Sequence, residues 1–280
     1  MASKIFSRLL DHRTDTQRFA DLIKDQNLTY LGSDALDLLG RTVCEIEAAG
    51  TAGALIETGC ALGGSSLVLA RFKSPGRELR LYDTFEQIPS PSGHDFADSH
   101  ARYEIIRSGK SKGLGGKPYY GYRGDLRPHI ERTFAEFRMP LRENNIVLIK
   151  GLYQDTLRLD RSVAFAHIDC DWYDSVMLSL NAIVPHLSVG GTLIIDDYYD
   201  YQGCRAAVWD FFRHRLDEFR LREKIRLTIT RLKDDKPTPD SLEPLSVSEI
   251  GEFNSVQDGS TTEASHSHWR MPLGPFNPRW

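Results

Sequence analysis

The sequence predicts an α/β protein with a Rossmann-like, mostly parallel sheet and helices on both faces. Three observations predict it: a strand–helix–strand unit whose strands each end in paired acids, a glycine-rich loop between an early strand and a helix, and an acid at the tip of the next strand. Crossover helices between parallel strands bring all of these turns to one edge of the sheet. Ligands bind at that edge in open sheets of this kind.

Length and composition narrow the class of protein. The chain has 280 residues, enough for one large domain with additions, and 40% of them are hydrophobic. A net charge of −4 without a basic block argues against nucleic acid as the main partner. The four cysteines form no C-x-x-C pair, which favours reduced thiols. No apolar run is long enough for a signal peptide or a membrane span, so we expect a cytoplasmic protein without a membrane partner.

Three regions are expected along the chain. Residues 1–50 form a helical segment, within which 34–49 has apolar residues at helical spacing. Residues 51–232 form the core that carries the sheet. Residues 233–280 are polar with scattered Pro and Gly, and we expect an irregular segment with a candidate final edge strand at 265–271.

A glycine-rich loop follows the first expected strand, 54–57. It contains Gly59, Gly63 and Gly64, and a helix follows it. Glycines let the backbone approach a ligand closely, and Ser65 can cap the helix. The spacing matches neither the dinucleotide fingerprint nor the phosphate-binding P-loop, so the loop alone is a weak indication of a cofactor.

The second expected strand, 78–83, strengthens that indication. It ends in Asp83, which lies 24 residues after Gly59. An acid at this distance and at a strand tip is placed to hydrogen-bond the hydroxyls of a ribose. Thr84 follows, and the ring of Phe85 could stack on a base. Strand, glycine loop and acid together predict a nucleotide-like cofactor.

The next stretch, 89–117, is rich in glycine and proline around a candidate helix at 95–107. A segment of this length and composition beside a cofactor site favours a lid or substrate loop over a linker. An amphipathic helix at 125–137 and a third strand at 145–150 follow.

The strand–helix–strand unit carries four acids. Asp169 and Asp171 follow its first strand, a helix is expected over 173–186, and Asp196 and Asp197 end the strand that begins after two glycines. Neighbouring carboxylates repel and raise each other's pKa values, and a hard divalent cation such as Mg²⁺ is the usual compensation. Single acids at strand ends are often helix caps or surface residues. A D-x-D and a D-D around one helix favour a functional site instead.

A helix at 204–216 and a strand at 225–232 complete the core. The motifs along the chain are, in order, Ile56-Glu-Thr-Gly-Cys-Ala-Leu-Gly-Gly-Ser65, Leu81-Tyr-Asp-Thr-Phe-Glu86, Lys150-Gly-Leu-Tyr-Gln-Asp-Thr-Leu157, His167-Ile-Asp-Cys-Asp-Trp-Tyr173, Gly190-Gly-Thr-Leu-Ile-Ile-Asp-Asp-Tyr198 and Gln202-Gly-Cys-Arg-Ala-Ala-Val208. Together these motifs resemble the macrocin O-methyltransferase (TylF-type) family. They lie between about residues 50 and 215, and the series is far more specific than any one motif. The chain departs from the family around its D-x-D, in the lid and after the core, which leaves the acceptor open.

The resemblance implies a class I methyltransferase fold with a seven-stranded sheet. It also implies S-adenosylmethionine and Mg²⁺ as cofactors, and transfer of a methyl group to a hydroxyl of a small molecule. The expected acceptor is a sugar hydroxyl of a glycoside, an oligosaccharide or a natural product. Under this resemblance we expect a cytoplasmic enzyme of natural-product biosynthesis. The sequence leaves open whether the enzyme forms a homo-oligomer.

The resemblance also implies roles for individual residues. Glu57, Gly59 and Ser65 would hold the methionine end of S-adenosylmethionine, and Asp83 its ribose. The full expected cofactor set is Glu57, Gly59, Gly63, Ser65, Asp83, Thr84 and Phe85.

For the acids, the resemblance assigns Mg²⁺ to Asp169, Asp196 and Asp197, and the role of general base to Asp171. On an extended chain, the D-x-D spacing puts Asp169 and Asp171 on one side, about 6–7 Å apart. One can then hold the metal while the other reaches the hydroxyl. His167 is the competing base, but it lies deeper in the strand, where a buried structural histidine is the commoner outcome.

Two other classes of function remain open from the sequence. A metal-dependent hydrolase or phosphoryl-transfer enzyme would use the same acids, but it does not explain the glycine loop and Asp83. A non-catalytic S-adenosylmethionine-binding protein explains the fold, but it leaves the clustered acids without a purpose.

Overall fold

The structure is a computed structural model that describes residues 12–223 and 225–232. The edge strand expected at 265–271 lies outside the described residues, as does the rest of 233–280. Among the residues that are described, no helix has the length and apolar character needed to cross a membrane.

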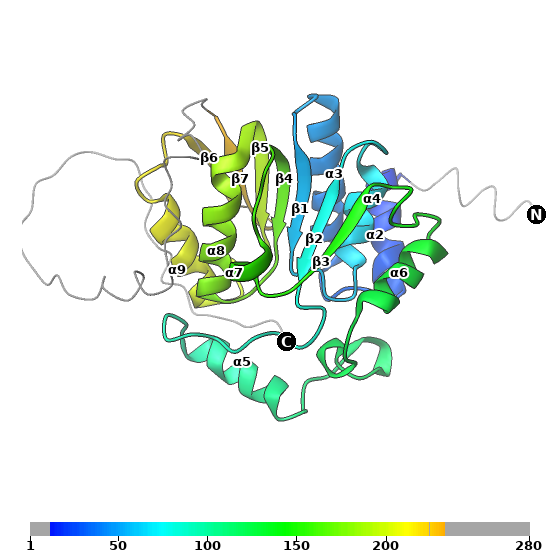
Figure 1. Ribbon diagram of the computed structural model, residues 1–280, viewed down its shortest axis with the longest axis vertical. Coiled ribbons are helices and arrows are strands. Elements are labelled where there is room, and N and C mark those ends of the chain that lie inside the picture. Colours follow the sequence, from blue (N-terminus) through cyan, green and yellow to red (C-terminus); the bar gives the residue numbers. More distant parts are fainter. Residues whose placement is uncertain (1–11, 224, 233–280) are drawn as a thin grey trace, which may run out of the picture. The chain divides into compact units, whose positions relative to one another are not determined.

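Seven strands form one sheet in the order β3-β2-β1-β4-β5-β7-β6 (Figure 1). The strands are β1 (Ala54–Thr58), β2 (Leu79–Asp83), β3 (Ile146–Lys150), β4 (Val163–Ile168), β5 (Leu187–Ile195), β6 (Phe219–Glu223) and β7 (Leu227–Arg231). Strands β1 to β5 are parallel, whereas β7 pairs antiparallel with β5 and with β6. The predicted α/β fold with a mostly parallel sheet is therefore confirmed.

Helices cover both faces of the sheet (Figure 1). On one face lie α2 (Asp15–Asp25), α3 (Ser33–Ala48), α4 (Gly64–Phe72) and α6 (Arg127–Glu136); on the other lie α7 (Tyr153–Thr156), α8 (Tyr173–Ile183) and α9 (Gln202–Phe212). Every residue of β1 is buried. Leu55 packs into the hydrophobic core on one face of the sheet, and its neighbour Ile56 packs into the core on the other face. This two-sided burial explains why the central strands are continuous apolar runs.

Two strands differ from the sequence-based prediction. Strand β6 has a largely polar sequence and was not predicted; it forms because it pairs along its whole length with β7 in an antiparallel hairpin. Strand β5 begins at Leu187, although the sequence predicts its start after Gly190 and Gly191. The register between β4 and β5 shifts at this point, so the glycines lie in an irregular part of the strand, where Gly190 has φ +76°.

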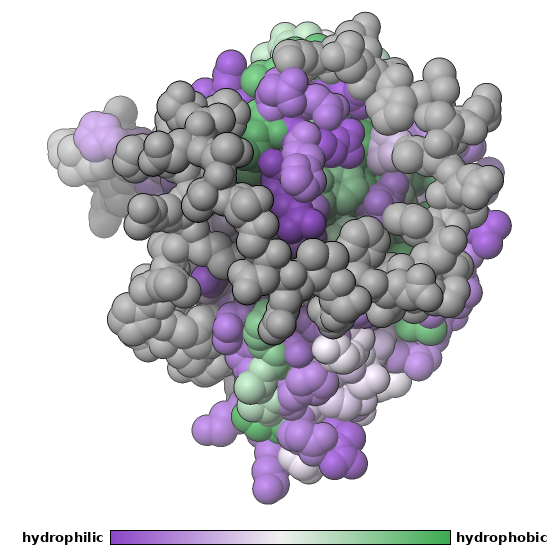
Figure 2. Space-filling view, turned by 90° about the vertical axis from the view of Figure 1, so that its left-hand side faces the viewer, coloured by the Kyte–Doolittle hydropathy of each residue, from purple (hydrophilic) through white to green (hydrophobic). Residues whose placement is uncertain are grey.

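The insertion between β2 and α6, residues 84–126, lies beyond the carboxyl ends of the parallel strands (Figure 1). It contains α5 (Ala97–Arg107) and the short 3₁₀ helices η1 (Leu114–Gly116) and η2 (Tyr120–Tyr122). Figure 2 shows hydrophobic side chains among hydrophilic ones in the lower part of the view, where the insertion lies. The exposed large side chains there include Phe96 and Ile105.

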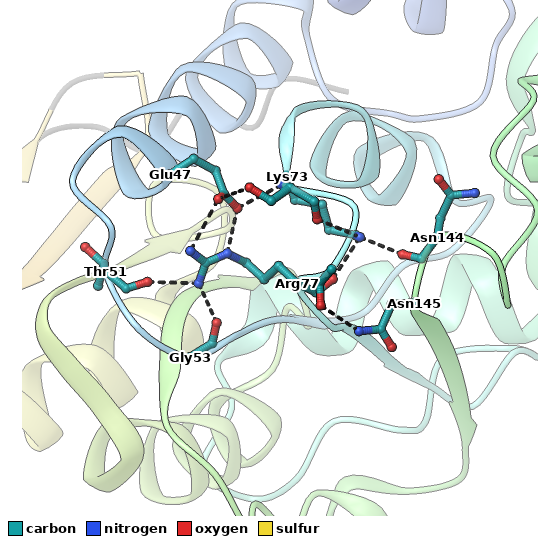
Figure 3. Close-up of polar contacts among 9 residues, drawn as sticks. Glu47, Thr51, Gly53, Lys73, Arg77, Asn144 and Asn145 are labelled. Carbon is teal, nitrogen blue, oxygen red and sulfur yellow. Dashed lines mark hydrogen bonds and ion pairs between the residues drawn. The ribbon is translucent and has the colours of Figure 1, made fainter.

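Charged side chains join the segments at the opposite, amino-terminal edge of the sheet (Figure 3). Arg77, before β2, donates to the carboxylate of Glu47 at 2.6 Å and to the carbonyl of Gly53 at 2.5 Å. Lys73 donates to the carbonyls of Arg77 at 2.8 Å and Asn144 at 2.6 Å. These bonds fix the starts of β1, β2 and β3 relative to one another. They lie at the edge of the sheet opposite the one where the sequence predicts the ligands.

Candidate functional site

The glycine loop and the acid-bearing loop touch each other at the carboxyl edge of the sheet. Gly59 has φ +87°, and a Cβ atom there would lie 1.7 Å from the carbonyl oxygen of Asp169. Only glycine therefore allows β1 and β4 to leave the sheet so close together. The predicted cofactor loop and the predicted metal-binding acids consequently lie side by side.

Asp83 holds the glycine loop. Its Oδ2 accepts hydrogen bonds from the backbone amides of Cys60 at 2.8 Å and Ala61 at 3.0 Å, and its Oδ1 accepts one from Phe85 at 2.7 Å. Burial raises the pKa of Asp83, and these three amides oppose that rise. The hydroxyl of Thr84 is a fourth donor at 3.3 Å, the longest of the set. Asp83 thus shapes the loop whether or not a ribose is bound.

Two expected cofactor contacts look different in the structure. Helix α4 begins after Gly63, and no side chain caps it, so the predicted cap by Ser65 is wrong. Phe85 has φ +54° and is 0% exposed within the hydrophobic core. Its ring therefore presents no open face, and stacking on a base stays a prediction that this geometry does not support.

A line of side chains with alternating charges connects the glycine loop to the acid-bearing loops; its members are Glu57, His167, Asp196 and Arg226. His167 Nδ1 lies 2.9 Å from Glu57 Oε1, and its Nε2 lies 3.9 Å from Asp196 Oδ1. Ser66, a residue that sequence reasoning missed, donates its hydroxyl to the other oxygen of Glu57. Arg226 donates to Asp196 at 2.5 Å. Glu57, expected at the methionine end of the cofactor, is itself fully buried in these contacts.

The pKa values in this line follow from its charges. Burial alone would lower the pKa of His167, but Asp196 and Glu57 outweigh it and raise the pKa to about 10. Burial alone would raise the pKa of Asp196, but His167 and Arg226 lower it below its usual value. The histidine is therefore a buried residue of the strand that is bonded to Glu57, as the structural alternative predicts.

Three acids converge beside this line. Oxygen atoms of Asp169, Asp171 and Asp197 all lie within 4.8 Å of one another. Burial and the neighbouring carboxylates raise the pKa values of Asp169 and Asp197 well above the usual range. The charged forms of Asp169 and Asp197 are therefore destabilised in this cluster, which is the situation that a divalent cation relieves.

A tight turn, rather than an extended chain, brings the D-x-D together. Strand β4 ends at Ile168, Asp171 has φ +57°, and the amide of Trp172 donates to the carbonyl of Cys170 at 2.6 Å. The expectation that an extended segment aligns Asp169 and Asp171 is therefore wrong. The turn also lets the amide of Asp171 donate to a carboxylate oxygen of β5's Asp197 at 3.1 Å.

Sequence reasoning missed two further residues near the acid cluster. Asp200 forms a second group with Asp196 and Asp197, whose oxygens also lie within 4.8 Å of one another. Its position three residues after the paired acids was an available signal. Arg226 has no such signal, because only the hairpin of β6 and β7 brings it to Asp196.

The insertion contributes aromatic and basic side chains at the same edge. The rings of Tyr119 and Tyr120 have centroids 4.4 Å apart, and the guanidinium of Arg102 lies 5.8 Å from the ring of Tyr119. Burial raises the pKa of Asp171 to about 6, and the charge of Arg102 opposes that rise. The expected lid therefore places a cation near the proposed base.

Comparisons with known proteins agree with this architecture. A family model described as macrocin-O-methyltransferase (TylF) matches residues 10–112 and 122–226. The 8-demethyl-8-(2,3-dimethoxy-alpha-L-rhamnosyl)-tetracenomycin-C 4'-O-methyltransferase of Streptomyces olivaceus is 33% identical over 190 residues, which are 65% of this chain and 67% of the relative. The demethyldecarbamoylnovobiocin O-methyltransferase of Streptomyces niveus is 24% identical over 201 residues, which are 68% of this chain and 69% of the relative.

Among solved structures, the O-methyltransferase NovP superposes with a TM-score of 0.61 at 22% identity, over 74% of this chain and 83% of that one. This likeness confirms the class I methyltransferase fold. That fold implies S-adenosylmethionine as the methyl donor. The family model covers most of the chain, and the chain therefore belongs to the macrocin O-methyltransferase family and is an O-methyltransferase.

Proposed function

We propose that this O-methyltransferase requires Mg²⁺ and methylates a sugar hydroxyl of a glycosylated natural product. The cluster of Asp169, Asp171 and Asp197 is the observation that carries the metal requirement. The relative from Streptomyces olivaceus, whose name describes methylation of a rhamnosyl compound, supports the class of acceptor. A family resemblance alone would not separate a sugar from another hydroxyl.

The donor set of the cluster fits a hard cation. Carboxylate oxygens are the ligands that Mg²⁺ prefers, and neighbouring carboxylates with raised pKa values, such as Asp169 and Asp197, gain most from its charge. The proposed ligands are Asp169, Asp196 and Asp197. Asp169 and Asp197 belong to this cluster, whereas Asp196 belongs to the second group, with Asp197 and Asp200. Asp196 accepts a hydrogen bond from Arg226, so the ion would compete with this guanidinium for one carboxylate. When bound, the ion would make a nearby hydroxyl more acidic.

Asp171 is the proposed general base. A sugar hydroxyl is about as weak an acid as water, so a base would have to take its proton during the transfer. The oxygen would bond to the methyl carbon of S-adenosylmethionine while the bond from that carbon to sulfur breaks, with S-adenosylhomocysteine as the leaving group. Asp171 lies within the acid cluster and is only partly exposed, and burial raises its pKa to about 6. A carboxylate with a raised pKa is a stronger base than an ordinary aspartate. A cation bound beside it would lower this pKa and favour the ionised form that can accept a proton.

On the cofactor side, we propose that Gly59, Gly63 and Ser65 line the methionine end of S-adenosylmethionine. Glu57 would act there through the loop that it supports, because its carboxylate is already bonded to Ser66 and His167. Asp83 would accept the ribose hydroxyls, and the bond from Thr84 is the one that a ribose can replace. Gly59 and Gly63 both have positive φ, so a side chain at either position would strain the loop.

Calorimetry and an acceptor screen test this proposal. S-adenosylmethionine should bind with and without Mg²⁺, which a hydrolase would not show. The screen should begin with 8-demethyl-8-(2,3-dimethoxy-α-L-rhamnosyl)-tetracenomycin C and include its aglycone, with mass spectrometry reading the gain of one methyl group. Methylation of glycosides but not of aglycones supports a sugar acceptor. Methylation of the aglycone alone would contradict it.

A further inference from the structure

The turn that carries Asp171 is strained and needs support. Asp171 is a non-glycine residue with φ +57°, a backbone region that side chains disfavour. Such a conformation persists only where neighbouring contacts impose it. Inside the core, the amide of Asp171 donates to Asp197, and the buried ring of Trp172 packs edge-on against Tyr201 with centroids 5.1 Å apart.

The insertion supplies two further supports. Both are hydrogen bonds from the two residues that follow Asp171. The indole Nε1 of Trp172 donates to the carbonyl of Pro89 at 2.9 Å. The backbone amide of Tyr173, the first residue of α8, donates to Oδ1 of Asp95 at 2.8 Å. No side chain of the turn itself caps α8, so Asp95 takes this role from 78 residues away.

Asp95 is itself fixed in place. Its Oδ2 accepts a hydrogen bond from the amide of Ser92 at 3.0 Å. Its Oδ1 lies against Gly203 of α9, where an added Cβ atom would be only 2.2 Å away. A glycine at this point of α9 therefore makes room for the carboxylate. The contacts place Asp95 between the first turns of the two helices that follow the acid-bearing strands.

From this geometry we infer that Asp95 is a positioning residue, which holds the turn of Asp171 in its productive conformation through Tyr173. The inference rests on the proposed function in one respect, namely that Asp171 is the base. A base displaced by even about 1 Å can lose much of its effect, of the order of 10²-fold. The root of the insertion is then part of the catalytic scaffold as well as the base of a lid.

Asp98 provides a matched control within the same insertion. Its Oδ2 accepts a hydrogen bond from the amide of Gln202, the first residue of α9, at 2.9 Å. Asp98 therefore caps the start of α9 in the way that Asp95 caps the start of α8. Within the described part of the chain, no hydrogen bond joins Asp98 to Trp172 or Tyr173, so loss of this cap should affect stability without affecting the turn.

The first experiment measures amide hydrogen exchange residue by residue in the wild type, D95A, D95N and D98A, without ligands. We expect D95A to speed exchange at Asp171 and Trp172 by about tenfold or more, although neither amide bonds to Asp95. D95N should stay within about threefold of the wild type, because its amide oxygen can accept the same bond. D98A should leave both amides unchanged.

The second experiment measures turnover with the rhamnosyl tetracenomycin, or with whichever glycoside the screen identifies. D95A should lower kcat by roughly 10–100-fold while KM for S-adenosylmethionine stays within about twofold. D95N should restore most of kcat, and D98A should keep it within about twofold. Should D95A fail to fold, Asp95→Ser keeps a shorter acceptor and should show a smaller loss of the same kind.

Two results would overturn the inference. One is faster exchange at Tyr173 alone, which would make Asp95 a local cap. The other is an equal loss of kcat in D95A and D98A, which would make the effect general destabilisation. If the wild type methylates no glycoside, the proposed function fails, but the exchange at Asp171 and Trp172 still decides whether Asp95 holds the turn.

Discussion

His167 and Glu57 form a fully buried pair, with Nδ1 of the histidine 2.9 Å from Oε1 of the glutamate. The pair joins β4, which leads to the acid cluster, to β1, which leads to the glycine loop. Because both side chains are 0% exposed, neither charge is compensated by water if its partner is removed. The pair therefore couples the geometry of the cofactor loop to that of the acids.

His167→Gln should act mainly on stability. Removing one partner of a buried pair costs about 3–5 kcal/mol, so urea denaturation should show a loss of that order. The folded pKa of about 10 exceeds the unfolded value of about 6.5. The stabilisation is therefore fully present below about pH 6.5 and disappears as the pH rises through 10, so the two proteins should converge in alkaline buffer. A folded but inactive His167→Gln variant, together with normal turnover in Asp171→Asn, would instead show that the base is not Asp171.

Asp171→Asn keeps the shape of the side chain and removes its basicity. We expect kcat to fall by roughly 10²–10⁴-fold, because proton transfer from the acceptor loses its base. Calorimetry should show nearly unchanged binding of S-adenosylmethionine and of Mg²⁺. Normal turnover in this variant would show that another group takes the proton.

Removal of divalent metal should abolish methyl transfer. Without a cation, the neighbouring carboxylates of Asp169 and Asp197 repel each other and cannot orient a hydroxyl. Turnover should stop in EDTA and return when Mg²⁺ is added in excess, with Ca²⁺ as a comparison ion. Full activity of a chelated, metal-free preparation would contradict the metal requirement.

Asp83→Ala should weaken the binding of S-adenosylmethionine by about 1.5–3 kcal/mol, the worth of a hydrogen bond to a charged group. The effect has two sources, because Asp83 would bind the ribose and already holds the amides of Cys60 and Ala61. Mg²⁺ affinity should barely change. Thr84→Val is a useful control, since it removes only the weakest donor to Asp83. Unaltered affinity of D83A for S-adenosylmethionine would contradict the proposed contact between Asp83 and the ribose.

The expected lid, 89–117, should slow its hydrogen exchange when cofactor and acceptor are both present. The structure sharpens this expectation, because Pro89 and Asp95 are bonded to the turn and to α8. We therefore expect the slowing to concentrate in 99–117, whereas the root of the insertion is already protected. Exchange that both ligands leave unchanged throughout 89–117 would make the segment a plain surface insertion.

The sequence by itself determined which edge of the sheet carries the chemistry. Apolar runs that end in Glu57, Asp83, Asp169 and Asp196 predict parallel strands, and the geometry of parallel strands brings their ends together whatever the side-chain details. The glycine loop was equally readable, because Gly59 is needed where β1 passes the carbonyl of Asp169. These features depend on local pattern and on general rules of topology.

Only the tertiary structure decided how the acids are held. The turn at Asp171, the pairing of Arg226 with Asp196, and the cap that Asp95 places on α8 each join segments that are distant in the sequence or depart from regular geometry. Periodicity reports whether a residue faces the core, but it contains no record of which distant partner a polar side chain finds. Those partners follow from the packing of the whole sheet, its hairpin and its insertion.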